Sequence, residues 1–259
     1  MTDDDGAFIA LLEDMIAAWA EVPAPPPVQL PDFSVASVSD VGAVAVAWGW
    51  TSRCVRLAEA ALLLHRQGYG NEGAPIMRSL IEHAIAIPWV VHKRGVAFQS
   101  LSRGRVRHFE KIDRAQETGW ALSEEAAERL CQAMVDDTDA DTKSEDVNLQ
   151  VFARALAYNL GKLYQAWLIE NAETHACLLS AEPYFEVHGE ERRATLLRIP
   201  KAMPPMMPHR IIAALHQAYL GYEAIQPGAL AQHLNEWDDR FTALMEPSTG
   251  RRRSAGGAT

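Results

Sequence analysis

Cysteine is scarce in this 259-residue sequence, and the three cysteines stand too far apart to suggest a shared site. Cys54, Cys131 and Cys177 include no Cys-x-x-Cys pair, and an odd number cannot form a complete set of disulfides. This usage is typical of reduced, buried cysteines in a cytosolic protein. A disulfide-stabilised secreted fold is therefore not expected.

Long apolar runs are also missing. The longest, from Ile81 to Val91, is interrupted by Glu82, His83 and Pro88, and it is shorter than the roughly 20 residues that a membrane-spanning helix needs. The N-terminus has no basic segment before its apolar residues, which argues against a secretory signal. The formal net charge of −10 disfavours a large non-specific nucleic-acid surface. We therefore expect a cytoplasmic protein with no membrane partner.

Strand-like alternation of useful length is absent too, whereas apolar residues recur at helical spacing over much of the chain. With 48% hydrophobic residues, the chain can form a sizeable core. We expect an all-α fold, a single bundle of about seven to nine helices. The expected organisation is an N-terminal helix at 1–22, a proline-rich linker at 23–40, the bundle domain at 41–246 and a disordered tail at 247–259.

The individual helices are expected between turns rich in proline or glycine. A turn at 68–70 should close one helix, and Asn71 is a natural N-cap for the next, in which Pro88 should introduce a kink. Residues 184–198 are compatible with either a helix or an irregular β-like segment, and residues 200–208 with a loop. The helices are expected at 6–21, 41–50, 53–67, 71–95, 96–118, 123–134, 151–181, 210–225 and 229–245.

The helix at 71–95 carries charged residues inside an otherwise apolar segment. Burying such groups unpaired is costly, so either the fold supplies partners for them or a function requires them. Arg78 and Glu82 are four residues apart and share one helix face with Ile85 and Trp89, which directs the pair toward the core. We expect an ion pair between Arg78 and Glu82, and a purely structural role for it is as plausible as a functional one.

The spacing Arg78-x-x-x-x-His83 resembles the short signature of the HEPN ribonucleases, all-α proteins in which Arg and His from paired helices meet at a dimer cleft. The resemblance implies that Arg78 stabilises charge on the phosphate and that His83 is a general acid or base on a ribose 2′-hydroxyl. It implies a homodimer, an RNA substrate and no metal. His83 lies about 140° around the helix from Arg78, so the two act together only near a helix end, a kink or a subunit interface. HEPN sequences usually carry a polar amide or an acid after the Arg, where this chain has Ser79.

A second resemblance covers more of the chain. The segment from Gly73 to Glu82, followed by Glu173-Thr174-His175-Ala176 and by Tyr184, is similar to an uncharacterised all-α family of bacterial proteins. Its members carry a similar Arg-Ser-Leu-x-Glu helix and a later His-containing helix. The likeness spans residues 53–184 and implies no particular activity.

This second resemblance suggests a geometry for the core. His175 stands on the same predicted stripe as Tyr164 and Asn171, so it would meet Arg78 and Glu82 across the bundle. Such a cluster would be either a polar pocket or a satisfied hydrogen-bond network.

A metal centre is not expected. A di-iron or di-manganese site in a helical bundle needs Glu-x-x-His pairs on facing helices. Here Glu82 is followed directly by His83, and Glu173 precedes His175 by two positions. We expect no cofactor either.

Two functions of different classes remain open, and with them the question whether the protein is an enzyme. The first is a HEPN-like, metal-independent RNase, acting as a toxin or defence component. The second is a non-catalytic helical protein whose Arg/Glu/His cluster is structural or binds a small anionic ligand. The candidate catalytic residues are Arg78, His83, Glu82 and His175, and the candidate binding residues are Arg107, His108, Asn171 and Tyr164.

Overall fold

The structure is a computed structural model of the full chain. It describes residues 3–25, 40–115, 119, 123–128, 147–176, 178–188, 193–201 and 207–246. Most of the expected proline-rich linker, the tail at 247–259, Cys131 and Cys177 lie outside these residues. Within them, Ser123 caps a short helical segment at 124–128 as expected, because its Oγ accepts a hydrogen bond of 3.2 Å from the backbone N–H of Ala126.

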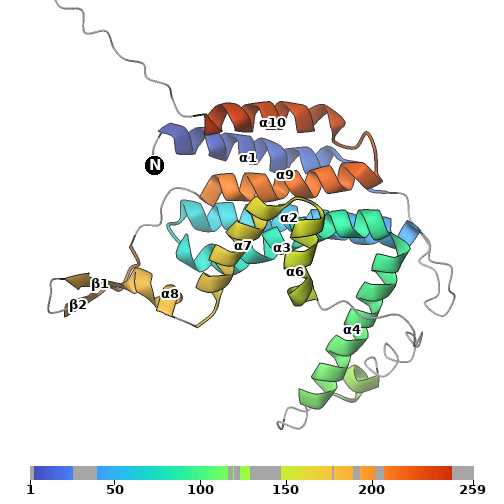
Figure 1. Ribbon diagram of the computed structural model, residues 1–259, viewed down its shortest axis with the longest axis horizontal. Coiled ribbons are helices and arrows are strands. Elements are labelled where there is room, and N and C mark those ends of the chain that lie inside the picture. The colour runs from blue at the N-terminus through green and yellow to red at the C-terminus, as the bar shows by residue number, and fades with distance from the viewer. Residues whose placement is uncertain are drawn as a thin grey trace, which may run out of the picture.

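The fold is all-α, as the apolar periodicity predicts (Figure 1). The elements are α1 (Asp3–Glu21), α2 (Asp40–Arg66), η1 (Asn71–Gly73), α3 (Ala74–Lys93), α4 (Gly95–Ala115), α6 (Val147–Ala157), α7 (Gly161–Thr174), α8 (Leu178–Ala181), η3 (Glu182–Tyr184), β1 (Phe185–His188), β2 (Arg193–Leu196), α9 (Met207–Ile225) and α10 (Ala231–Met245). A short antiparallel hairpin is added between α8 and α9, with Phe185 opposite Leu196.

Helices α2 and α3 form the expected antiparallel hairpin, with two differences at its ends. The two helices expected at 41–50 and 53–67 are one continuous helix, α2, because no residue between them interrupts the backbone hydrogen bonds. Gly68 ends the hairpin's first arm with φ of 79°, a conformation that glycine adopts without strain. Asn71 is not the N-cap of α3, because it begins the 3-10 turn η1 and Gly73 takes the capping position.

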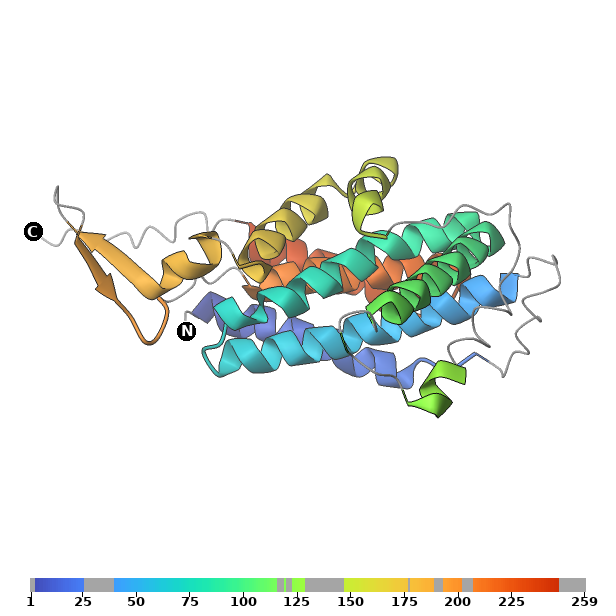
Figure 2. The same cartoon turned by 90° about the horizontal axis from the view of Figure 1, so that it is seen from below.

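Helix α3 is the centre of the core, where it packs against α2, α7 and α9 (Figures 1 and 2). Pro88 lies inside the helix, which continues to Lys93. Ile85 and Trp89 are buried, as their position on the inward face predicts. The buried residues of α3 are Ala74, Met77, Leu80, Ile81, Ala84, Ile85, Ala86, Ile87, Trp89 and Val90.

Helix α1 belongs to the same core rather than standing apart from it. It packs against α9 and α10, and its Leu11, Leu12 and Met15 are fully buried. The Tyr219 hydroxyl on α9 donates a hydrogen bond of 2.7 Å to the backbone carbonyl of Met15. In Figure 1 these three helices form the layer above α2 and α3.

The long helix expected at 151–181 is instead three helices. Helix α6 ends at Ala157, and Asn159 adopts a left-handed φ of 57° before α7 begins at Gly161. Asparagine tolerates this conformation better than most residues. The break could not be predicted from the sequence, because the apolar spacing continues through it. A third short helix, α8, follows α7 and leads into η3 and the hairpin, which projects from one end of the bundle in both views (Figures 1 and 2).

The C-terminal helices agree with the sequence prediction apart from their starts. Helix α9 begins at Met207, so the last two residues of the expected loop are helical, with Pro208 in the first turn where a missing N–H costs nothing. Gly228, with φ of 91°, turns the chain into α10. None of the described helices is long and apolar enough to cross a membrane.

The close approach of α3 and α9 depends on Gly221. A Cβ at this position would lie 2.5 Å from Cγ2 of the fully buried Ile87. We predict that Gly221→Ala lowers the free energy of unfolding by about 1–3 kcal/mol, because the two helices would have to separate. Urea denaturation measures the loss.

The matched control is Gly49→Ala on α2, where an added Cβ meets nothing within 4 Å. This variant should gain about 0.5–1 kcal/mol, because alanine loses less conformational entropy than glycine in a helix. A Gly221→Ala protein as stable as the Gly49→Ala protein would contradict the packing described for α3 and α9.

Candidate functional site

The expected ion pair on α3 is present. Arg78 Nη2 lies 3.7 Å from Glu82 Oε2, and the two side chains are 24% and 16% exposed. The Nε of Arg78 is buried and has no hydrogen-bond partner among the described residues. The pair is therefore intermediate between a surface ion pair and a fully buried one.

Trp167 on α7 is the residue that meets this pair across the helix interface. Its indole Nε1–H donates to Glu82 Oε2 at 3.5 Å, and the Arg78 guanidinium carbon lies 5.7 Å from the centre of its ring system. Tyr164 stacks on the same indole, with ring centres 5.7 Å apart and planes at 14°. Arg78, Glu82, Trp167 and Tyr164 thus form one cluster between α3 and α7, called below the Trp167 cluster.

His175 does not take part in the Trp167 cluster, contrary to the sequence-based expectation. It follows the last residue of α7, has an extended backbone with φ −92° and ψ 151°, and is exposed. The expectation failed because α7 ends at Thr174, so the inward stripe stops before reaching it. Asn171 is on α7 and half-buried. The sequence does contain a signal for the residue of α7 that meets Glu82: Trp167, because a buried indole N–H needs a hydrogen-bond acceptor.

His83 lies on the other flank of α3. Its ring packs edge-on against Trp50 of α2, with ring centres 5.7 Å apart and planes at 84°. Its Nδ1 donates a hydrogen bond of 2.7 Å to the carbonyl of Ser79, which leaves Nε2 as the acceptor nitrogen of the neutral ring. Burial lowers the pKa of His83, so the neutral form is favoured.

Arg78 and His83 are therefore not brought together within one chain. Arg78 contacts α7 and His83 contacts α2, as their angular separation on the helix predicts. Arg107 and His108 lie on α4, which leads away from the bundle in Figure 1. His108 is exposed, whereas the side chain of Arg107 lies outside the described residues.

A second charged contact joins α7 to α9. Arg210 Nη1 donates to Glu170 Oε1 at 2.7 Å, and the Glu170 side chain is only 3% exposed. Burial raises the pKa of Glu170, while the hydrogen bond and charge of Arg210 act in the opposite direction. Burial also raises the pKa of Glu173, one turn further along α7, and the Arg210 charge lowers it.

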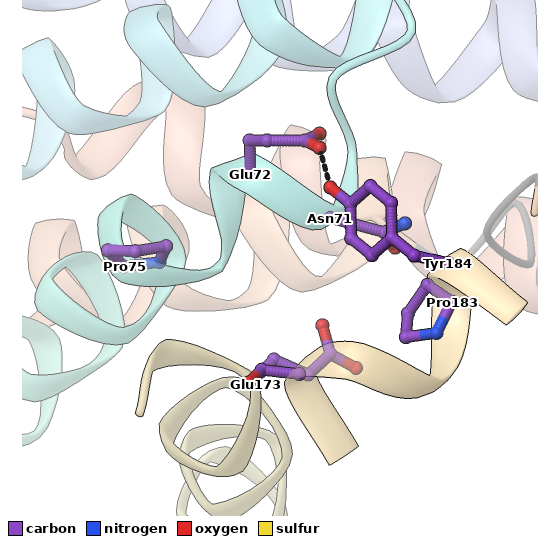
Figure 3. Close-up of a pocket in the computed structure, with 7 residues that line it drawn as sticks. Asn71, Glu72, Pro75, Glu173, Pro183 and Tyr184 are labelled. Atoms are coloured by element: carbon purple, nitrogen blue, oxygen red, sulfur yellow. Dashed lines mark hydrogen bonds between the residues drawn. The ribbon is translucent and has the colours of Figure 1, made fainter. Parts of the chain in front are cut away.

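A cleft of about 200 Å³ opens where α3 begins and α7 ends (Figure 3). Glu72 and Glu173 lie on opposite sides of this space in Figure 3. The Tyr184 hydroxyl donates a hydrogen bond to Glu72, which raises the pKa of the phenol. The lining of the cleft comes from η1, α3, α7, α8 and η3, and consists of Asn71, Glu72, Pro75, Glu173, Ser180, Pro183 and Tyr184.

Three residues of the lining, Pro75, Glu173 and Tyr184, belong to the stretches that carry the second resemblance, and Asn71 and Glu72 directly precede the first of them. The model of a family of unknown function, DUF5677, matches residues 44–192. The chain belongs to this family. The DUF5677 match contains every residue that lines the cleft, together with the whole Trp167 cluster. No curated protein and no solved structure matches the chain.

The DUF5677 assignment leaves the chemistry to be argued from the site itself. In the part of the chain that the structure describes, no group of three or more His, Cys, Asp or Glu side chains is arranged to hold a metal ion. Cys54 is buried in the core, and burial strongly raises the pKa of its thiol, so it is a poor nucleophile there. The two polar sites of interest are thus the Trp167 cluster and the cleft.

The Trp167 cluster makes a testable prediction about stability. Glu82→Ala leaves the half-buried Arg78 without its acid and the Trp167 N–H without its acceptor, so we expect a loss of about 1–3 kcal/mol in the free energy of unfolding. Denaturant unfolding of the double variant Arg78→Met/Glu82→Leu should show a smaller loss, because no charge is left unpaired.

Trp167→Phe removes the indole N–H together with the five-membered ring, so the hydrogen bond to Glu82 and part of the packing on Arg78 and Tyr164 are lost at once. It should cost about 1–3 kcal/mol in the free energy of unfolding, comparable with Glu82→Ala. Equal losses for the single Glu82 variant and the double variant would show that unpaired charge does not set the cost.

Proposed function

We propose that this protein is a non-catalytic helical protein that binds a small ligand in the cleft between the start of α3 and the end of α7. The observation that carries this proposal is the convergence of η1, α3, α7, α8 and η3 on one concave site that is lined by both polar and apolar groups. Concave sites with a few polar groups on apolar walls are the usual form of small-molecule sites.

The Trp167 cluster has a structural role in this proposal. The Arg78 charge is already met by Glu82, and its guanidinium faces an indole ring, so little positive charge is left to attract an anion. By fixing α7 against α3, the cluster also holds the two sides of the cleft together. A small-anion site at Arg78 is accordingly the less favoured form of this function.

The proposal is tested by filling the cleft. Pro75 lines it from an exposed position in the first turn of α3, so Pro75→Trp should occupy the space with little effect on folding. Ligand-observed NMR with a mixture of small cationic, neutral and anionic fragments should show binding to the parent protein that Pro75→Trp abolishes.

Leu63→Trp is the matched control, because Leu63 is 60% exposed on α2 and lies outside the cleft. This variant should bind the same fragments as the parent protein. Fragment binding that Pro75→Trp leaves intact, or an absence of binding by any fragment, would overturn the proposal.

A metal-independent RNase is the second candidate, and the state of His83 is the observation that favours it. Its Nδ1–H is held by the Ser79 carbonyl, which leaves Nε2 as the nitrogen that could accept a proton, and its lowered pKa favours the deprotonated ring that a general base needs. Because Arg78 and His83 face different helices, this function needs a second copy of the chain to complete the site. Arg107 and His108 would contribute RNA contacts from α4.

An RNase of this kind should cleave RNA in the presence of EDTA. His83→Ala should abolish the cleavage, whereas His188→Ala, at an exposed position on β1, should leave it unchanged. The rate should rise with pH only up to the lowered pKa of His83 and stay level through neutrality, because the base is then already neutral. A folded His83→Ala variant as active as the parent would exclude this candidate.

A further inference from the structure

We propose that the ligand of the cleft is a small organic cation with N–H donors, a primary ammonium or a guanidinium group. This inference rests on the proposed function and names the class of ligand that the cleft would take. It is carried by the charge of the cleft, by the hydrogen-bonding state of its two carboxylates and by its size.

The lining of the cleft is acidic on both sides. Glu72 approaches from η1 and Glu173 from the last turn of α7, and none of the seven lining residues in the described part of the chain is Lys, Arg or His. The two carboxylates lie across the space from each other in Figure 3. A bound anion would be repelled from both sides, whereas a cation between them would be attracted from both.

Two cationic side chains on neighbouring elements are already engaged in ion pairs. Arg210 donates to Glu170 at 2.7 Å, and Lys201 lies 3.9 Å from Glu186 on β1. Glu173 is left with an Oε2 that is buried and accepts no hydrogen bond from the described residues. In Figure 3 its carboxylate points toward Pro183 and Tyr184. A buried carboxylate oxygen without a donor is unfavourable, and a rotation of the half-buried Glu173 carboxylate would turn this oxygen into the cleft, where a ligand N–H would satisfy it.

Glu72 is oriented to accept a hydrogen bond from the same ligand on the opposite side of the cleft. The Tyr184 hydroxyl donates to its Oε1, which fixes the carboxylate and leaves Oε2 to accept from a ligand. Pro75, Pro183 and the Tyr184 ring provide apolar surface for the hydrocarbon part of the ligand. Ammonium and guanidinium groups have the several N–H donors that two separate carboxylates require.

The size of the cleft limits the ligand further. Its volume of about 200 Å³ is below the roughly 300–1,000 Å³ of sites for drug-sized molecules. A divalent metal ion is a poorer fit, because no cluster of three or more acidic, His or Cys ligands occurs among the described residues. The geometry thus selects an amine or guanidine of a few heavy atoms.

The test measures the affinity of the 259-residue chain for defined probes. The probes are 1,4-diaminobutane, methylguanidinium, tetramethylammonium, acetate and magnesium chloride, titrated by calorimetry at low ionic strength. We expect the first two to bind. Tetramethylammonium, which has no N–H donor, should bind at least about tenfold more weakly, because it cannot hydrogen-bond to either carboxylate.

Variants locate the binding. Glu173→Gln and Glu72→Gln should each weaken binding of the two N–H cations by about tenfold or more. Glu182→Gln removes the same charge from an exposed residue that is two positions from Tyr184 and does not line the cleft, so it should change the affinity less than about twofold. Circular dichroism establishes that each variant is folded. Glu173→Gln and Glu72→Gln test the two sides of the cleft independently of each other.

The outcomes separate this inference from the proposed function. If acetate or magnesium binds in a manner that Pro75→Trp abolishes while the N–H cations do not bind, the cleft is a ligand site and only the ligand class is wrong. If Glu182→Gln and Glu173→Gln weaken cation binding equally, the binding depends only on the general negative charge of the surface, and the inference is overturned. If Pro75→Trp leaves the binding of every probe intact, the inference and the proposed function both fail.

Discussion

The burial of α3 between α2, α7 and α9 is the constraint on which the rest of this structure depends. A helix covered on so many sides must be apolar over most of its surface, and its neighbours must come close. Small residues permit this approach, and Gly221 of α9 lies directly against Ile87. The polar side chains in the middle of α3 lie where two neighbouring helices meet it, and each of them needs a hydrogen-bond or ion-pair partner there.

The polar side chains of α3 have different kinds of partner on the two sides of the helix. Toward α7, Arg78 and Glu82 pair with each other and then meet Trp167 through a hydrogen bond and a ring contact. Toward α2, His83 bonds to the carbonyl of Ser79 within its own helix and packs against Trp50. The polar residues at mid-helix are thus largely satisfied inside the fold, and the carboxylates that are left for a ligand lie at the start of the helix.

The sequence predicts those features of the fold that depend on spacing along one helix. The helical period predicts the all-α class, the Arg78–Glu82 pair and the inward face of α3. Glycine's freedom at positive φ predicts the turn at Gly68. The break at Asn159 could not be predicted in this way, because the apolar spacing continues across it. The same break and the early end of α7 explain why His175 is exposed and Trp167 takes its place.

The candidate cleft was hidden from the sequence for a related reason. Its residues come from separate elements, and only the antiparallel packing of α7 on α3 brings Glu173 close to Glu72. A sequence indicates which residues share a face of one helix, but it does not show which ends of two helices meet. Similarity to a known family pointed to both segments, and the fold supplied their contact.

The DUF5677 match and the core do not have the same boundaries. The matched residues, 44–192, include α3, α7 and the cleft, while α9, which covers another side of α3, begins only at Met207. Helix α9 also contributes Arg210, which bonds to Glu170 one turn before Glu173. Because a cation held by Glu170 cannot fully neutralise Glu173 as well, α9 both closes the core and leaves the cleft with its negative charge.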